Sequence, residues 1–101
     1  MKWLWTWGGK SFGYRSGDDL FTYFGKHVGK LHDSEIYDAQ GKYLGELTKN
    51  NRLIVNSQKN SFLKSSFVPH AGSSYVNYVD YVGYAMYAGY KDFPYPETFK
   101  A

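Results

Sequence analysis

The sequence of 101 residues contains no cysteine and few prolines, and neither sign of charge dominates it. The absence of cysteine excludes a disulfide-stabilised scaffold and any metal site with thiolate ligands. Twelve lysines and arginines stand against nine acidic residues, and the resulting net charge of +3 is compatible with a phosphate-bearing partner without requiring one. Charge and covalent cross-links therefore do not explain how this chain folds.

A long apolar run is also missing. No stretch reaches the roughly 18 apolar residues that a membrane helix needs, and the sequence after Met1-Lys2 does not have the apolar core of a secretion signal. We therefore expect a soluble, cytoplasmic protein without a membrane partner. The length fits a single domain spanning residues 1–101.

Aromatic residues are abundant and make up 21% of the chain, with eleven tyrosines, seven phenylalanines and three tryptophans. Each of these side chains buries a large area, so a small domain can form a core from few of them. This composition excludes disorder for most of the length.

A repeat of sixteen residues organises the first part of the chain. The segments 9–13, 25–29 and 41–45 each read Gly-Lys, two variable residues and Gly, and the second of the variable residues is apolar. Other positions keep the same register, among them the apolar residues Leu4, Leu20 and Ile36 and the aromatic residues Trp5, Phe21 and Tyr37. Turn-forming pairs end the copies at 17–18, 33–34 and 49–50.

The length of the repeat predicts a β-hairpin. Sixteen residues suit two short strands with two turns and are too few for a strand with a crossover helix. Phe12, Val28 and Leu44 occupy equivalent places in the returning strands, and we expect them to face a shared centre. In a fourth, weaker copy, residues 53–56 would form the first strand and Phe62-Leu63, shifted by about two residues, the second.

These glycine-lysine hairpins, together with the ending Ala-Gly-Tyr-Lys-Asp-Phe at 88–93, resemble a bacterial domain family called the 4-fold beta flower. The resemblance covers roughly residues 1–62. It implies an all-β fold of about four hairpin repeats in a pseudo-four-fold, flower-like arrangement around an axis. It implies no activity and no catalytic residue.

The C-terminal part follows a different pattern, with a tyrosine at every third position from 75 to 90. This period matches neither a strand nor a regular helix, so both a helix capped by Ser74 and an extended chain stay open. The tyrosines could form an edge that binds a partner or a lid over the open end of the flower, and the lid is the favoured interpretation. The chain is thus divided into hairpin repeats (1–63), a loop (64–74), the tyrosine-triplet segment (75–93) and a tail (94–101).

A basic zone lies between Glu46 and Asp80, where the sequence contains no acidic residue. Its cations are Lys49, Arg52, Lys59 and Lys64. If exposed aromatic rings lie nearby, such a zone could bind single-stranded RNA or DNA by phosphate contacts and base stacking. The more ordinary interpretation is a solvated basic surface.

The three tryptophans Trp3, Trp5 and Trp7 alternate along the first strand and therefore share one face. They could form an exposed aromatic platform for a ligand. Burial is the favoured interpretation, because aromatic residues recur at the equivalent positions of the later copies.

The remaining chemical motifs favour structural roles. The segment 8–11, Gly-Gly-Lys-Ser, imitates a phosphate-binding loop, but its Gly-Lys belongs to the hairpin turn. We expect His27 on the strand surface and His32 in a turn, and no carboxylate is evident that would complete a metal site with them or with His70. The acidic residues Asp18, Asp19, Asp33, Glu35 and Asp38 mostly fall at turn positions.

The sequence therefore predicts a non-catalytic binding or interaction module, or an oligomer-forming structural domain. We expect no cofactor and no bound metal, and either a protein partner or self-association. Binding of single-stranded nucleic acid is the alternative, and a small hydrolase is the least favoured function.

Overall fold

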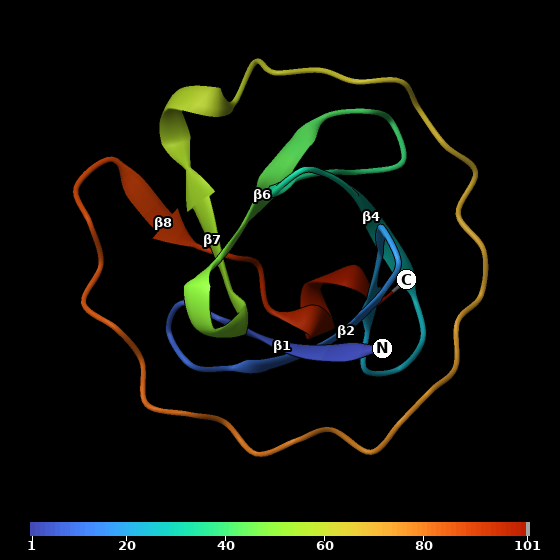
Figure 1. The fold of residues 1–101 in the computed structure, drawn as a ribbon, viewed down its shortest axis with the longest axis horizontal. Helices are drawn as coiled ribbons and strands as arrows, with labels where there is room; N and C mark the ends of the chain where they lie inside the picture. Colours follow the sequence, from blue (N-terminus) through green and yellow to red (C-terminus); the bar gives the residue numbers. More distant parts are fainter. Residues whose placement is uncertain (101) are drawn as a thin grey trace.

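A computed structural model describes residues 1–100 and shows a closed ring of β-hairpins (Figure 1). Seven strands follow one another around the ring, and β7 closes it by pairing in parallel with β1. An eighth strand adds to β7. The strands are β1 (Lys2–Thr6), β2 (Ser11–Ser16), β3 (Asp19–Thr22), β4 (His27–His32), β5 (Glu35–Tyr37), β6 (Tyr43–Thr48), β7 (Arg52–Asn56) and β8 (Tyr90–Asp92).

The first three copies of the repeat are antiparallel hairpins, as predicted: β1 with β2, β3 with β4, and β5 with β6. Each hairpin has its register shift at the same place, directly after Leu4, Leu20 and Ile36. The turns between hairpins contain a left-handed residue at Gly17, Asp33 and Asn50, with φ of 60°, 58° and 61°. The sixteen-residue periodicity is therefore present in the backbone as well as in the residue types.

The fourth copy departs from the prediction. Residues 53–56 lie in β7, as predicted, but Phe62 and Leu63 do not form its partner strand; Leu63 only makes an isolated bridge with Lys42. After β7 the 3-10 turn η2 (Ser57–Lys59) is followed by a segment that bonds to the third hairpin. The place beside β7 is taken instead by β8, which comes from the far end of the chain.

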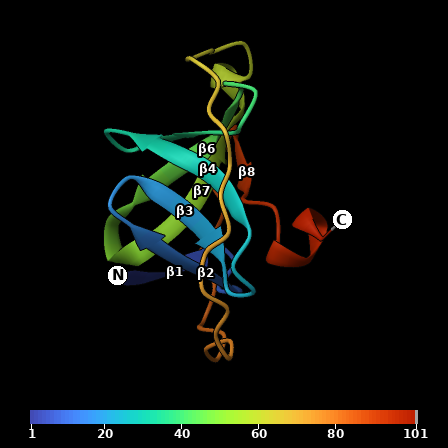
Figure 2. The same cartoon turned by 90° about the vertical axis from the view of Figure 1, so that its right-hand side faces the viewer.

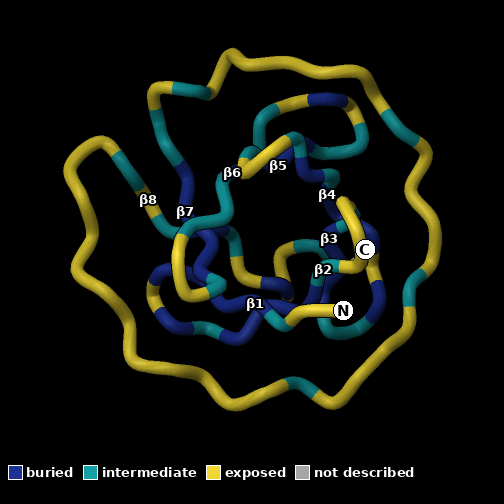
Figure 3. Tube along the Cα trace, in the orientation of Figure 1, coloured by how far each residue is buried: buried dark blue, intermediate teal, exposed yellow. Residues whose placement is uncertain are grey.

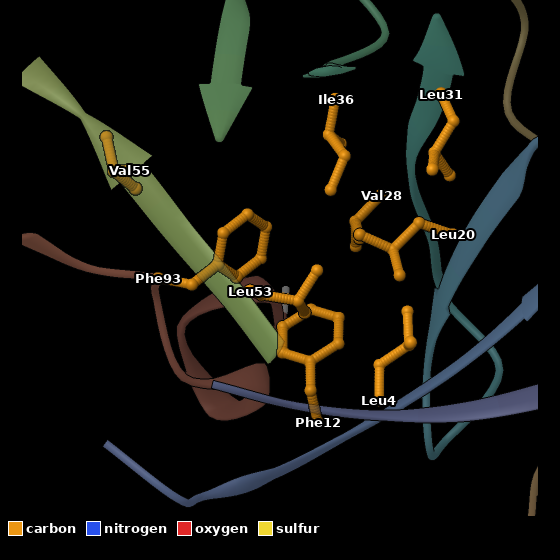
Figure 4. Close-up of a cluster of buried hydrophobic side chains, with 9 residues drawn as sticks. All are labelled: Leu4, Phe12, Leu20, Val28, Leu31, Ile36, Leu53, Val55 and Phe93. Atoms are coloured by element: carbon orange, nitrogen blue, oxygen red, sulfur yellow. The ribbon is translucent and has the colours of Figure 1, made fainter. Parts of the chain in front are cut away.

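The apolar core fills the middle of the ring (Figure 4). Phe12 and Val28 are buried there and Leu44 packs against them, so the three equivalent positions face a shared centre, as predicted. Phe93, which follows β8, supplies an aromatic side chain from the fourth quarter, with its ring 5.2 Å from that of Phe12. The 3-10 helix η3 (Pro96–Phe99) then packs Phe99 against the same core. Of the predicted tail 94–101, Ala101 lies outside the described residues.

Residues 64–89, which we call the belt, encircle the ring of strands (Figures 1 and 2). Almost all of the belt is extended chain outside any helix or strand, which decides between the two alternatives for the tyrosine triplets. The belt covers the repeats, as predicted, but it does so around their circumference and not across an open end. Its residues are mostly exposed, whereas the strands inside it are mostly buried (Figure 3).

The belt is attached to the ring at the glycine of each Gly-Lys turn. The carbonyls of Gly41, Gly25 and Gly9 accept hydrogen bonds of 2.8, 2.9 and 2.8 Å from the amides of Lys64, Gly72 and Tyr81, which are spaced eight and nine residues apart along the belt. The three glycines share a left-handed conformation with φ of 85° to 96°. The turn repeat thus provides three equivalent attachment points, which the belt reaches in reverse order.

Replacing Gly41 by valine should destabilise the protein strongly. Gly41 has φ of +85°, and a Cβ atom there would clash with the carbonyl of Lys64 in the belt. Gly17 is the matched control, because it has φ of +60° but open space around it. We expect Gly17→Val to cost about 1–2 kcal/mol from backbone strain alone, and Gly41→Val to cost on the order of 1–3 kcal/mol more from the clash. Equal melting temperatures for the two variants would contradict the role assigned to the belt contact.

Candidate functional site

Trp3 and Trp5 of β1, and Trp7 directly after it, lie on the outside of the ring beneath the belt. Trp5 and Trp7 are buried, and their indole nitrogens donate hydrogen bonds of 3.0 and 2.9 Å to the carbonyls of Val79 and Ala85. Trp3 is partly exposed. Burial is therefore confirmed for two of the three, but these side chains do not belong to the central apolar cluster.

Tyrosine rings of the belt pack on these indoles. Tyr81 stacks on Trp5 with ring centroids 4.3 Å apart, and Tyr78 lies 4.7 Å from Trp3. Trp7 contacts Tyr84 at 5.0 Å and Tyr87 at 5.2 Å. The aromatic platform predicted as a ligand surface thus exists, but the chain's own tyrosines occupy it.

The outer face of the belt is apolar. In each triplet the tyrosine turns partly inward, whereas the residue after it points to solvent: Val76, Val79 and Val82 are 91, 75 and 85% exposed. The rings of Tyr78 and Tyr81 keep about half of their surface accessible. The result is a continuous strip of exposed apolar and aromatic side chains around one side of the molecule.

Arg52, which the sequence places in the basic zone, is buried at 4% exposure. Its guanidinium donates hydrogen bonds to the carbonyls of Trp7 and Val82, at 3.3 and 3.0 Å, and lies 4.2 Å from the ring centre of Tyr84. The cation thus joins β1, β7 and the belt. The prediction that Arg52 belongs to a phosphate-binding surface was wrong, because the N–H groups of its guanidinium already donate to backbone carbonyls.

Lys59 has carboxylate partners of its own. Its ammonium group lies 2.7 Å from Glu35 and also contacts Glu46. The hydrogen bond from Lys59 holds the pKa of Glu35 below its usual range, and the bonds from the two carboxylates raise the pKa of Lys59. Lys59 therefore adds little positive potential to the surface, contrary to the predicted basic zone.

The other two cations of the zone are exposed. Lys64 begins the belt, and its ammonium group lies 5.9 Å from the ring centre of Tyr37. Lys49, in the 3-10 turn η1 (Lys49–Asn51), borders a cleft of about 560 Å³. The zone thus consists of one buried cation, one partly buried cation paired with carboxylates, and two exposed cations.

This cleft opens between the fourth quarter of the ring and the belt. Its walls are aromatic on the belt side, and polar side chains from β6 and η1 line the opposite side. On the belt, the cleft begins at Tyr84, after the last of the three bonds to Gly-Lys turns, which Tyr81 makes. Its lining residues are Trp7, Glu46, Thr48, Lys49, Asn50, Ile54, Tyr84, Ala85, Tyr87 and Tyr90.

A second group of functional side chains is centred on His27. Its side chain is only 2% exposed, so its expected place on the strand surface was wrong. Nε2 of His27 lies 3.1 Å from Asp19 of the neighbouring strand β3, and His70 of the belt lies 3.9 Å from the same carboxylate. Burial lowers the pKa of His27, which favours the neutral imidazole. His32 is partly exposed at the end of β4.

The sequence analysis missed Asp19 and His70 as neighbours of His27. The repeat offered one usable signal: Trp3, Asp19 and Glu35 occupy one position of the repeat, and Ser11, His27 and Tyr43 another. Adjacent strands bring these two positions together, so Asp19 could have been paired with His27. Nothing in the sequence indicated that the belt would return His70 to the same place.

None of the helices among residues 1–100 combines the length and apolar character required to cross a membrane.

Lowering the pH should weaken the fold through Glu35. Because its pKa is depressed in the folded state, its contribution to stability is present above its ordinary value of 4.5 and is lost as the pH falls through the lower folded value. We expect the free energy of unfolding, measured with denaturant between pH 6 and about pH 3, to fall less steeply in Lys59→Met. The exposed turn variant Lys26→Met should keep the wild-type slope. An unchanged slope in Lys59→Met would contradict this pairing.

The comparisons with known proteins bear on the ring and the first part of the belt. A family model described as 4-fold beta flower protein matches residues 1–72, which include the three complete hairpins, β7 and the segment carrying His70. Searches of curated proteins and of solved structures find no match. Since the matched segment covers more than half of the sequence, the chain belongs to the 4-fold beta flower family.

Proposed function

We propose that this chain is a non-catalytic interaction module that associates with a second copy of itself through the outer face of the belt. The observation that carries the proposal is the exposure of 75 to 91% at Val76, Val79 and Val82, on a strip that also exposes tyrosine rings. Isolated exposed apolar residues are ordinary on protein surfaces, but a contiguous strip marks an interaction site.

The charge of the strip favours a partner that is itself apolar. Between Tyr75 and Tyr90 the only charged residue is Asp80, and its carboxylate accepts a hydrogen bond of 2.9 Å from the amide of Ser11 inside the belt. Asp80 is exposed, but this one partly engaged carboxylate is the only charge that the segment offers for selecting a charged partner. Burial of apolar surface is the available driving force.

The triplet pattern makes the strip self-complementary. A tyrosine recurs at every third residue and is followed by valine in the first three triplets and by alanine in the next two, so two strips can meet around a two-fold axis with rings against valines. Association by an open edge of β7 at the fourth copy has less support, because β8 pairs with the residues of β7 that β1 leaves unpaired. The belt, and not a strand edge, is therefore the surface that we assign to self-association.

Sedimentation velocity at increasing concentration tests this proposal. We expect a monomer–dimer equilibrium in the micromolar range for the wild type and a monomer for Val82→Lys, because a lysine at the centre of the contact would have to be desolvated. Gln58→Lys adds the same charge at an exposed residue outside the belt and should leave the equilibrium unchanged. A wild type that stays monomeric at several hundred micromolar would overturn the proposal.

Binding of single-stranded nucleic acid is a second candidate, now centred on the cleft beside Lys49. There an exposed lysine borders the aromatic rings of Tyr84 and Tyr87, which combines a phosphate contact with a surface for base stacking. The cations Arg52 and Lys59, which have internal partners, are not part of this site.

Titrating a labelled single-stranded oligonucleotide at several salt concentrations tests this candidate. Lys49→Glu should weaken binding and reduce the log–log salt slope by about 0.7 per lost phosphate contact. Tyr87→Ala should cost about 1–3 kcal/mol of binding free energy without changing the slope. Lys26→Glu, at an exposed turn outside the cleft, serves as the charge control. Absence of binding to both RNA and DNA at low salt would remove this candidate.

A further inference from the structure

We propose that Asp19, His27 and His70 form a binding site for a divalent transition-metal ion of the zinc class. The three side chains come from β3, β4 and the belt, and each offers one ligand atom within 4.8 Å of the other two. Two imidazole nitrogens and one carboxylate oxygen are a donor set that zinc accepts and that calcium and magnesium do not favour.

The strongest evidence is a pair of buried polar atoms that lack a hydrogen-bonding partner. Within the described part of the chain, neither Nε2 of His27 nor Oδ1 of Asp19 makes a hydrogen bond of acceptable geometry, although the two atoms lie 3.1 Å apart and both are buried. Buried polar groups are nearly always paired, so such an orphaned pair calls for an explanation. A cation that binds both atoms would give each of them the polar partner that it lacks.

The equivalent positions of the other two hairpins differ in this respect. The hydroxyl of Ser11 donates to Asn77 at 2.7 Å, and the hydroxyl of Tyr43 donates to Glu46 and accepts from the amide of Asn56, both at 3.0 Å. In those copies the polar atom at this position is satisfied by the protein itself. Only the second hairpin presents an unsatisfied ligand atom there.

The surroundings of His27 suit a metal ligand. Phe21 stacks on its ring at 4.9 Å, and Phe67 lies 4.7 Å away on the belt side. This aromatic shell holds the imidazole of His27 in one orientation. The side chain of His70 is 59% exposed, so an ion can enter from solvent.

Binding requires two local adjustments. Ligand atoms around a tetrahedral zinc ion lie about 3.4 Å apart, as follows from bond lengths near 2.1 Å. The exposed side chain of His70 must therefore close on the others. In addition, Nδ1 of His27 accepts a bond of 3.3 Å from the amide of His70, and it must instead carry the proton once Nε2 binds the metal. The belt around His70 is thus expected to shift when the ion binds.

Such an ion would attach the belt to the ring of strands in a metal-dependent manner. Asp19 and His27 belong to the ring, whereas His70 belongs to the belt, two residues before the amide of Gly72 that bonds to Gly25. An ion shared by the three would add a strong attachment to the backbone hydrogen bonds from Gly72 to Gly25 and from Tyr75 to Tyr23 that already hold the belt at the second hairpin. It would also stabilise the folded state by mass action, because the unfolded chain does not assemble the site.

Titration of the full chain, prepared without a histidine tag, with Zn²⁺ in a calorimeter and with Co²⁺ as the spectroscopic probe tests this proposal. We expect one ion per chain, cobalt d–d absorption bands, and a zinc-dependent rise in melting temperature. In imidazole NMR spectra the signals of His27 and His70 should shift, whereas those of His32 should not.

Variants separate the site from non-specific binding to histidine. His70→Ala, on a largely exposed side chain, should leave the fold intact and weaken zinc binding at least tenfold, and Asp19→Asn should weaken it similarly with little change in shape. His32→Ala is the matched control and should bind as the wild type does. Zinc binding that is undetectable at 100 μM, or equally strong in His70→Ala and the wild type, would overturn the proposal. Neither result depends on whether the chain self-associates.

Discussion

The hydrogen bond between the belt and the carbonyl of a turn glycine, made three times, is the interaction on which the rest of the structure depends. At each Gly-Lys turn the backbone is left-handed, and a side chain at Gly9, Gly25 or Gly41 would occupy the place of the belt. Together with the bonds from the Trp5 and Trp7 indoles to the carbonyls of Val79 and Ala85, these contacts hold the tyrosines over the two indoles. The glycines thus allow both the left-handed turn of each hairpin and the close approach of the belt.

The many aromatic side chains of the chain lie in two concentric layers. Aliphatic side chains and Phe12 and Phe93 fill the centre, whereas the tryptophans and tyrosines pair between the ring and the belt. Tyrosine suits the outer layer because one ring can pack on an indole while its edge and hydroxyl stay in water. This arrangement leaves the valines of the triplets without a place inside, which is why they form the exposed strip.

The specific features of the molecule arise where equivalent positions have diverged. Ser11, His27 and Tyr43 occupy the same place in three similar hairpins, yet they meet different partners. Ser11 meets the amide of Asn77 and His27 the imidazole of His70, both in the belt, whereas Tyr43 meets the ring of Phe62 just before the belt. The fourth quarter diverges further, since β8 replaces a hairpin partner and a cleft opens beside Lys49. A repeated scaffold with one continuous cover therefore presents a different chemical surface in each quarter.

The sequence by itself determined the hairpins, their register, their turns and the inward position of Phe12, because these follow from interactions between residues close in the chain and repeat three times. It did not determine the partner of β7, the course of the belt, the burial of Arg52 and His27, or the meeting of His27 with Asp19 and His70. These depend on contacts between segments far apart in the sequence, which local propensity and periodicity do not encode. The triplet period in particular could not be assigned from the chain alone, because an extended belt takes its spacing from the surface that it covers.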